Sequence, residues 1–248
     1  MASLETFPHS DKKREAKAEG RYNFEEIAEL KEPMASLINL LKEKIEAGEY
    51  DVLISDDASG RIPTLIVKKV IDSIRSEDGN IKTFFIAAGK DRRIDERAIK
   101  EFAGKTLSKT HRALVVTELI YSGKSIRRLA KVLDDGGFND FDIAAVMASQ
   151  DFFDGKKDVE MVEKGHEIFC GEIGDPIPNI YDSRFITGVA RRRRVEAEGS
   201  YVTGAHPYLA EDLFEYTGDD RVEVKKSVSK ARQDVKLLSD EILSEVWK

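Results

Sequence analysis

Two segments of the chain carry apolar residues at the spacing of an amphipathic helix. In each of them, apolar side chains recur three and four positions apart, which places them on one face of a helix. The first segment spans residues 33–51, and Gly48 predicts where its helix ends. The second, at residues 224–247, predicts a terminal helix that packs either on its own domain or on a partner. The apolar positions are Met34, Leu37, Ile38, Leu41 and Ile45 in the first helix and Val228, Ala231, Val235, Leu238 and Ile242 in the second.

The N-terminal end of the chain is polar and charged over its first twenty or so residues, which predicts a loose tail. Order is expected to begin near Asn23. This residue and Glu26 have the spacing of a capping box at the start of a short helix. Pro33 is then expected to open the long helix, because proline suits the first helical position.

The middle of the chain, from residue 50 to residue 147, alternates short apolar runs with helical stretches. Apolar strands that follow one another through helices are typical of a parallel sheet covered on both faces, so an α/β fold is expected. Ligands of such sheets bind at the carboxyl ends of the strands. Strands are expected at 51–56, 81–88, 113–118 and 140–147, with a further candidate at 166–172, and helices at 63–74 and 125–137.

Composition and charge narrow the classes of protein to consider. The 248 residues are 41% hydrophobic and 35% charged, which is typical of a globular protein with a charged surface. The net charge of -7 argues against a general nucleic-acid binder. A single cysteine, Cys170, excludes an intramolecular disulfide. No apolar run approaches the length of a membrane span and the first residues lack the core of a signal peptide, so a cytoplasmic protein without a membrane partner is expected.

The tripeptide Gly123-Lys124-Ser125 suggests a triphosphate-binding loop, but the spacing upstream excludes that reading. Such a loop needs a glycine five positions before its Gly-Lys pair, and this chain has Glu118 there. A strand that runs through a short loop into a helix still predicts an anion site, because the first amides of the helix lack partners. The serine hydroxyls of the loop add donors, and Glu118 could accept hydrogen bonds from a sugar diol. These residues predict a ribose 5-phosphate pocket; alternatively, Glu118 only stabilises the helix electrostatically and Ser122 is its N-cap.

At this point the sequence resembles the phosphoribosyl pyrophosphate motif of the type I phosphoribosyltransferases. Residues 114–116 match its apolar strand, Glu118 its second acid, residues 119–120 its apolar pair and residues 122–125 its phosphate loop. Thr117 stands where the family has its first acid, which leaves one carboxylate for the ribose. The resemblance implies a ribose-phosphate site made by Thr117, Glu118, Tyr121, Ser122, Gly123, Lys124 and Ser125. At Tyr121 the purine-specific members carry an acidic residue, so the acceptor base stays open.

The family resemblance also implies a pyrophosphate loop after the first strand. Ser59, Gly60 and Arg61 stand there, directly before a helix, and are similar to the basic loops of adenine-type members. The alternative is an ordinary strand-to-helix turn capped by Ser59. Asp56 and Asp57 are expected either to contact Mg²⁺ through water or to be merely solvated.

A mobile lid is implied for residues 88–112, a connection longer than the fold needs. Lys90, Arg92 and Arg93 are placed to reach the pyrophosphate on closure and are the expected catalytic cations. The alternative is a solvated surface helix between Asp95 and Gly104.

The resemblance implies an enzyme that transfers ribose 5-phosphate from phosphoribosyl pyrophosphate to a nitrogen nucleophile such as a nucleobase, with Mg²⁺ on the pyrophosphate and a homodimer as the expected assembly. The rival is a non-catalytic sensor, which Thr117 favours. A third possibility, another phosphosugar or nucleotide enzyme such as a hydrolase, is disfavoured because the sequence offers no plausible nucleophile–base pair.

The expected organisation is a tail and short helix (1–32), a phosphoribosyltransferase-like core (33–150), and the rest of the sheet, a variable hood and the C-terminal helix (151–248). In this last part, Arg191 to Arg194 either bind phosphate or RNA or are solvated, and His206 either stacks on a base or lies in a loop.

Overall fold

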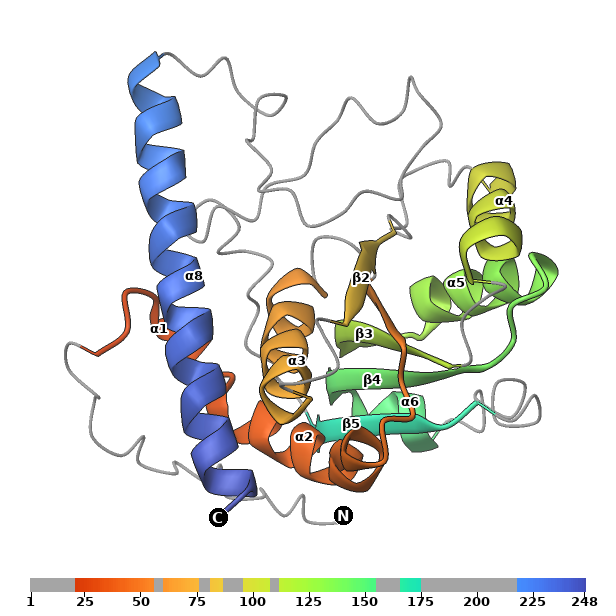
Figure 1. Cartoon of the computed structure of the whole chain (residues 1–248), viewed down its shortest axis with the longest axis horizontal. Helices are drawn as coiled ribbons and strands as arrows, with labels where there is room; N and C mark the ends of the chain where they lie inside the picture. Colours follow the sequence, from red (N-terminus) through yellow and green to blue (C-terminus); the bar gives the residue numbers. More distant parts are fainter. Residues whose placement is uncertain are drawn as a thin grey trace, which may run out of the picture.

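The structure, a computed structural model, describes residues 21–55, 60–75, 81–86, 96–107, 112–154, 166–174 and 218–248. Its centre is a five-stranded sheet in which every neighbouring pair of strands is parallel, in the order β2-β1-β3-β4-β5 (Figure 1). The expected parallel α/β sheet is therefore confirmed, including the candidate fifth strand. The strands are β1 (Val52–Ser55), β2 (Lys82–Phe85), β3 (Ala113–Ile120), β4 (Phe141–Ala148) and β5 (Ile168–Ile173).

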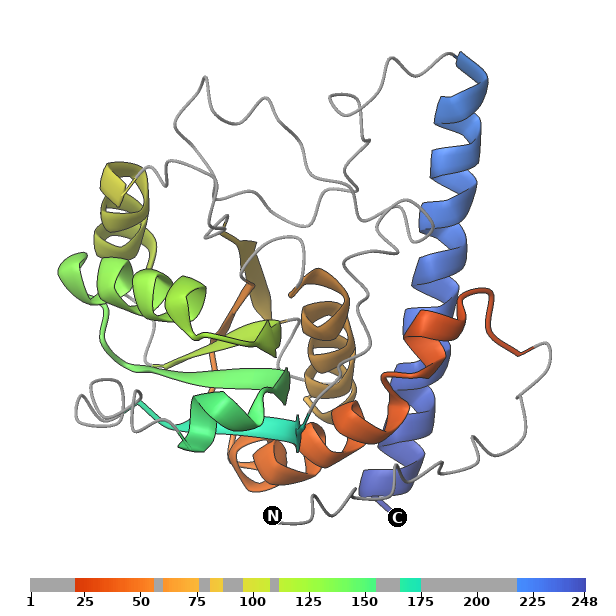
Figure 2. The same cartoon turned by 180° about the vertical axis from the view of Figure 1, so that it is seen from behind.

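Helices cover both faces of the sheet and bury a separate apolar cluster on each (Figures 1 and 2). Alternate strand residues serve the two faces: Leu114 and Val116 enter one cluster, Val115 the other. The first face carries α1 (Glu25–Ala28), α2 (Lys31–Glu46), α3 (Arg61–Ile74) and α8 (Gly218–Val246); the second carries α4 (Glu96–Thr106), α5 (Lys124–Asp135) and α6 (Gln150–Asp154). Among the helices of these described ranges, none is long and apolar enough to cross a membrane.

The helix predicted at 33–51 forms as α2, and its five expected apolar residues are fully buried. It begins two residues before Pro33 and ends as Gly48 predicts. Gly48 adopts a left-handed φ of 71°, and its N–H donates to Ile45 O while that of Glu49 donates to Lys44 O. These two hydrogen bonds form the Schellman motif, which ends many helices at a glycine.

The capping box expected at Asn23 is wrong. Helix α1 has Phe24 as its N-cap, without a side-chain cap of its own. Instead, Asp234 of α8 accepts hydrogen bonds from the backbone N–H of Asn23 (3.1 Å) and of Phe24 (2.8 Å) and from Asn23 Nδ2 (2.7 Å). A buried carboxylate from the far end of the chain thus satisfies the start of α1, which no local pattern could reveal.

The terminal helix α8 packs on its own domain, which confirms the first of its two expected roles. Ala231, Val235, Leu238 and Ile242 are buried in the cluster shared with α1, α2 and α3. Trp247 Nε1 donates to Glu46 at 2.7 Å, so the end of α8 is also tied to α2. Both described ends of the chain therefore contribute to one core, and Figure 2 shows α1 lying against α8.

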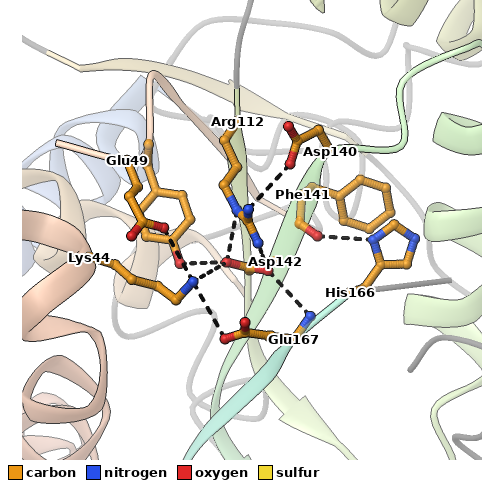
Figure 3. Close-up of polar contacts among 9 residues, drawn as sticks. Lys44, Glu49, Arg112, Asp140, Phe141, Asp142, His166 and Glu167 are labelled. Carbon is orange, nitrogen blue, oxygen red and sulfur yellow. Dashed lines mark hydrogen bonds and ion pairs between the residues drawn. The ribbon is translucent and has the colours of Figure 1, made fainter. Parts of the chain in front are cut away.

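A charged cluster lies at the amino edge of the sheet, around the fully buried carboxylate of Asp142 (Figure 3). Arg112 Nη2 donates to it at 2.7 Å, the Tyr50 hydroxyl at 2.8 Å and the backbone N–H of Glu167 at 3.2 Å, while Lys44 Nζ lies 3.5 Å away. Burial alone raises the pKa of Asp142, but the hydrogen bonds from Arg112 and Tyr50 outweigh it and hold the pKa below its usual value. The cluster joins α2, the segment after it and the starts of three strands.

Replacing Asp142 by Asn is expected to lower the free energy of unfolding by roughly 3 to 5 kcal/mol, because Arg112 loses its buried counter-charge. Since the folded pKa of Asp142 lies below the unfolded one, its contribution is complete above the unfolded pKa of about 3.9 and is lost as the pH falls through the folded pKa. The difference in urea-unfolding free energy between the two proteins should thus be constant above about pH 5 and shrink in more acidic solution. Asp140→Asn is the control, because Asp140 is exposed and lies 3.5 Å from the same arginine; equal losses in the two variants would contradict the burial argument.

Close contact between α2 and β5 depends on Gly171. A Cβ at this position would lie 2.0 Å from Pro33 O and 2.8 Å from Val146 O, both of them backbone atoms that a rotamer change cannot move. Any side chain here therefore separates the first turn of α2 from the edge strand.

Gly171→Ala is expected to destabilise the fold by about 3 kcal/mol, at the upper end of overpacking effects, because backbone must move. Gly174→Ala is the matched control, since nothing lies within 4 Å of its added Cβ. Thermal unfolding of the two variants measures the difference, and similar melting temperatures would contradict the close approach.

Candidate functional site

The order of the strands creates a switch point between β1 and β3. The chain proceeds from β1 to β2 on one side of β1 and then returns to β3 on the other side. The connections that leave the carboxyl ends of β1 and β3 consequently diverge to opposite faces, through α3 and α5. Ligands of open parallel sheets bind in the crevice at such a point. The two loops with a family resemblance are the connections that leave these two strands.

Strand β3 extends beyond its neighbour at this edge. Ser55, the last residue of β1, pairs with Val116, so the last four residues of β3 extend past β1 and have β4 as their neighbouring strand. Thr117 and Glu118 are the first two of them, and both are buried, at 1% and 3% exposure. Glu118 is therefore a buried carboxylate at the carboxyl edge of the sheet.

The loop after β3 is held by its carbonyl groups. Ser149, which follows β4, donates its N–H to Ile120 O (3.0 Å) and its hydroxyl to Tyr121 O (2.7 Å). Arg127, one turn into α5, donates its Nη2 to Ser122 O (2.5 Å) and its N–H to Gly123 O (2.9 Å). Four consecutive carbonyls thus accept hydrogen bonds from other parts of the protein, and these bonds fix the main chain of the loop.

The donors of the same loop have no comparable partners. Helix α5 begins at Lys124, so the geometry of a helix leaves the N–H groups of residues 124–126 without helical acceptors. Within the described ranges no residue accepts a hydrogen bond from these three N–H groups or from the hydroxyls of Ser122 and Ser125. Ser122 and Lys124 are exposed. The arrangement of donors and one ammonium group can hold an anion with the charge of a phosphate.

The N-cap of α5 is Gly123, without a side-chain cap hydrogen bond, so the alternative in which Ser122 caps this helix is wrong. Gly123 has a left-handed φ of 66°. A Cβ here would lie 2.5 Å from Cε2 of Phe152 in α6 and 2.6 Å from Nη1 of Arg127. Both the conformation and the contact with the Phe152 ring thus require glycine.

The second predicted loop is described from Gly60 onward. Gly60 is the N-cap of α3, and its carbonyl accepts hydrogen bonds from the N–H (2.8 Å) and the hydroxyl (2.6 Å) of Thr64. Arg61 is 6% exposed, and its guanidinium lies 4.3 Å from the ring centre of Phe85, the last residue of β2. A cation is therefore buried beside the carboxyl ends of β1 and β2.

Other predicted site residues fall outside the described ranges: Asp56, Asp57, Ser59, Lys90, Arg92, Arg93, Arg191 to Arg194 and His206. Within the predicted lid, helix α4 runs to Thr106, two residues past Gly104. Ile99, Phe102 and Ala103 of this helix are buried against the second face, and Lys100 lies 3.1 Å from Asp135 of α5. The surface helix of the alternative therefore forms, with one face packed on the core and residues 101 and 104–106 exposed.

A metal site made by the protein alone is absent from the described ranges, which contain no group of three His, Cys, Asp or Glu side chains able to hold an ion. The expected Mg²⁺ needs few protein ligands, because it binds mainly through phosphate oxygens of the substrate. Glu118 is a buried carboxylate at this edge within the described part of the chain. Mg²⁺ at this edge of the sheet therefore stays an expectation.

Comparisons with known proteins leave the family open: no family model matches the chain, and no curated protein matches it significantly. The resemblance to phosphoribosyltransferases consequently depends on the residues of the two loops.

Sequence reasoning missed the residues that hold the loop after β3. Ser149 follows the apolar run of β4, and Phe152 lies three residues later. Their position after the neighbouring strand was the available signal, because carboxyl ends of parallel strands share one edge. Arg127, inside a predicted helix, offered no signal.

Gly123→Ala is expected to destabilise the protein more than Gly137→Ala. Gly137 also has a left-handed φ, of 82°, but nothing lies within 4 Å of a Cβ added there. The left-handed backbone costs each variant about 1 kcal/mol. The clash with Phe152 adds roughly 1 to 3 kcal/mol at Gly123 alone. Urea unfolding measures both losses, and equal values would contradict the contact between Gly123 and α6.

Proposed function

We propose that the protein binds phosphoribosyl pyrophosphate and transfers its ribose 5-phosphate to a nitrogen nucleophile such as a nucleobase. The observation that supports this most directly is the loop after β3, whose four carbonyls are tied inward and whose helix-initiating N–H groups lack acceptors in the described ranges. In the proposal, these N–H groups, the hydroxyls of Ser122 and Ser125 and the Lys124 ammonium hold the 5-phosphate. One phosphate suits a single helix start.

Glu118 is proposed to hold the ribose. Its carboxylate lies on the strand that leads into the phosphate loop, and a carboxylate can accept hydrogen bonds from both hydroxyls of a diol. Burial at 3% exposure strengthens such charge-assisted bonds, because less water competes for the carboxylate.

The pyrophosphate is assigned to the other side of the switch point, at Gly60 and Arg61, together with the predicted Ser59. Lys90, Arg92 and Arg93 stay predictions as the cations that stabilise the departing pyrophosphate. Mg²⁺ bound to the pyrophosphate would neutralise its charge as it leaves. Otherwise this chain's residues act mainly by positioning the sugar and excluding water.

A sensor without turnover is the second candidate, and Thr117 favours it. This residue stands where the family has its first acid and is 1% exposed, so one carboxylate is missing beside the proposed ribose position. The homodimer, the cytoplasmic location and the absence of nucleic acid as a partner stay predictions.

Calorimetry with Mg²⁺ and phosphoribosyl pyrophosphate, followed by a pyrophosphate-release assay with a panel of nucleobases, separates these proposals. Binding with release supports the transferase, and binding without release under every base supports the sensor. Absence of binding overturns both.

Two pairs of variants test the residues. Glu118→Gln is expected to weaken ribose 5-phosphate binding by roughly 1.5 to 3 kcal/mol, about 10- to 150-fold, through loss of charge-assisted hydrogen bonds. Its control is Glu172→Gln, the same substitution on the edge strand β5. Glu172 is exposed and lies at the same level of the sheet, because Glu172 and Leu119 both pair with Met147 of β4. Lys124→Ala is expected to weaken the same binding by about 1 kcal/mol, whereas Lys131→Ala, which is also exposed on α5 and is bound to Asp135, leaves it unchanged. Unchanged affinity in both Glu118→Gln and Lys124→Ala would contradict the assigned site.

A further inference from the structure

Two side chains from different elements hold adjacent carbonyl groups of the loop after β3. The hydroxyl of Ser149, which follows β4, donates to Tyr121 O at 2.7 Å, and Arg127 Nη2, from α5, donates to Ser122 O at 2.5 Å. Ser149 is 1% exposed, so little water competes for its hydroxyl. Neither side chain is among the groups proposed to hold the phosphate.

These two bonds also determine the direction of the N–H groups that follow. The C=O of one residue and the N–H of the next belong to one planar trans peptide and point in opposite directions. Because Ser149 holds the Tyr121 carbonyl, the N–H of Ser122 points away from Ser149. In the same way, the N–H of Gly123 points away from the Arg127 guanidinium. Within the described ranges, no residue accepts a hydrogen bond from either N–H.

The N–H groups of Ser122 and Gly123 extend the row of donors that begins α5. Gly123 has a left-handed φ of 66° directly before the helix, and successive N–H groups in such a turn form a concave site for an anion. Rotation of either peptide would present a carbonyl oxygen instead, whose partial negative charge repels an anion. The hydrogen bonds from Ser149 and Arg127 oppose this rotation.

We infer that Ser149 and Arg127 are positioning residues for anion binding, which act through the main chain of the loop by keeping the N–H groups of Ser122 and Gly123 directed toward the phosphate. This inference rests on the proposed function of the same site. It makes the affinity for phosphate depend on the residue after β4, outside the loop that binds the ligand.

Calorimetry with ribose 5-phosphate tests the role of Ser149. Ser149→Ala removes one hydroxyl and should weaken binding by about 5-fold, the factor that one hydrogen bond supplies. Ser239→Ala is the matched control, because Ser239 is also 1% exposed and its hydroxyl donates to Val235 O at 2.6 Å, in α8 on the other face of the sheet. Both variants should lose similar stability, but Ser239→Ala should keep the affinity. Unchanged affinity in Ser149→Ala overturns its role.

Arg127→Met should weaken the same binding by roughly 10-fold, because a charged donor is lost. The ratio to the unmodified chain should persist in 1 M salt, where the Debye length is about 3 Å and a charge acting from a distance is screened. Arg127→Lys keeps a donor and should restore most of the affinity. A ratio that disappears in salt, or a lysine that restores nothing, overturns the positioning role of Arg127.

An NMR titration of the ¹⁵N-labelled chain with ribose 5-phosphate follows the N–H groups themselves. The amide resonances of Ser122 and Gly123 should shift together with those of residues 124–126, and in Ser149→Ala the shift of Ser122 should be smaller. Shifts confined to residues 124–126 overturn this inference and leave the proposed function standing. Failure of ribose 5-phosphate to bind the unmodified chain overturns both.

Discussion

The parallel pairing of β1 with β3 is the constraint on which the rest of the structure depends. Val52–Ser55 pair with Ala113–Val116, so two connections that lie more than fifty residues apart in the sequence leave the sheet at one edge. Because β2 occupies the other side of β1, these connections run to opposite faces, and α3 and α5 both begin beyond the carboxyl edge of the sheet, where ligands of open parallel sheets bind. The pairing thus brings the two loops of the proposed site to one edge of the sheet, whatever their side chains.

The register of that pairing also determines which strand supports the site. β3 continues for four residues past the end of β1 and has only β4 beside it there. The residue after β4, Ser149, consequently meets the loop after β3 and supplies both hydrogen bonds that hold its first two carbonyls. α6 follows directly and brings Phe152 against Gly123, so the conformation of the loop is determined jointly by β4, α6 and α5.

Periodicity predicted the elements because burial of one face leaves a local signature: α2, α3, α5 and the five strands lie where the apolar patterns place them, with ends shifted by a few residues. Contacts between distant segments left no such signature. The cap of α1 comes from Asp234, more than 200 residues away, and the close approach of Gly171 to Pro33 joins the edge strand to the second helix. At the site, Glu118 and residues 122–125 could be found from motif spacing, whereas Ser149, Arg127 and Phe152 required the strand order, because their roles exist only once β4 lies beside β3.

The two edges of the sheet differ in how their polar groups are satisfied, and this difference argues for placing function at the carboxyl edge. At the amino edge, the buried Asp142 carboxylate meets Arg112, Tyr50, Lys44 and the N–H of Glu167, so the cluster is complete within the protein (Figure 3). At the carboxyl edge, the protein satisfies the carbonyls of the loop after β3 but supplies, within the described ranges, no acceptor for the N–H groups that begin α5. A buried network with all its partners stabilises the fold, whereas donors held rigidly without acceptors stabilise whatever anion reaches them. The internal hydrogen bonds of the loop therefore stabilise a conformation in which the N–H groups that begin α5 are available to a ligand.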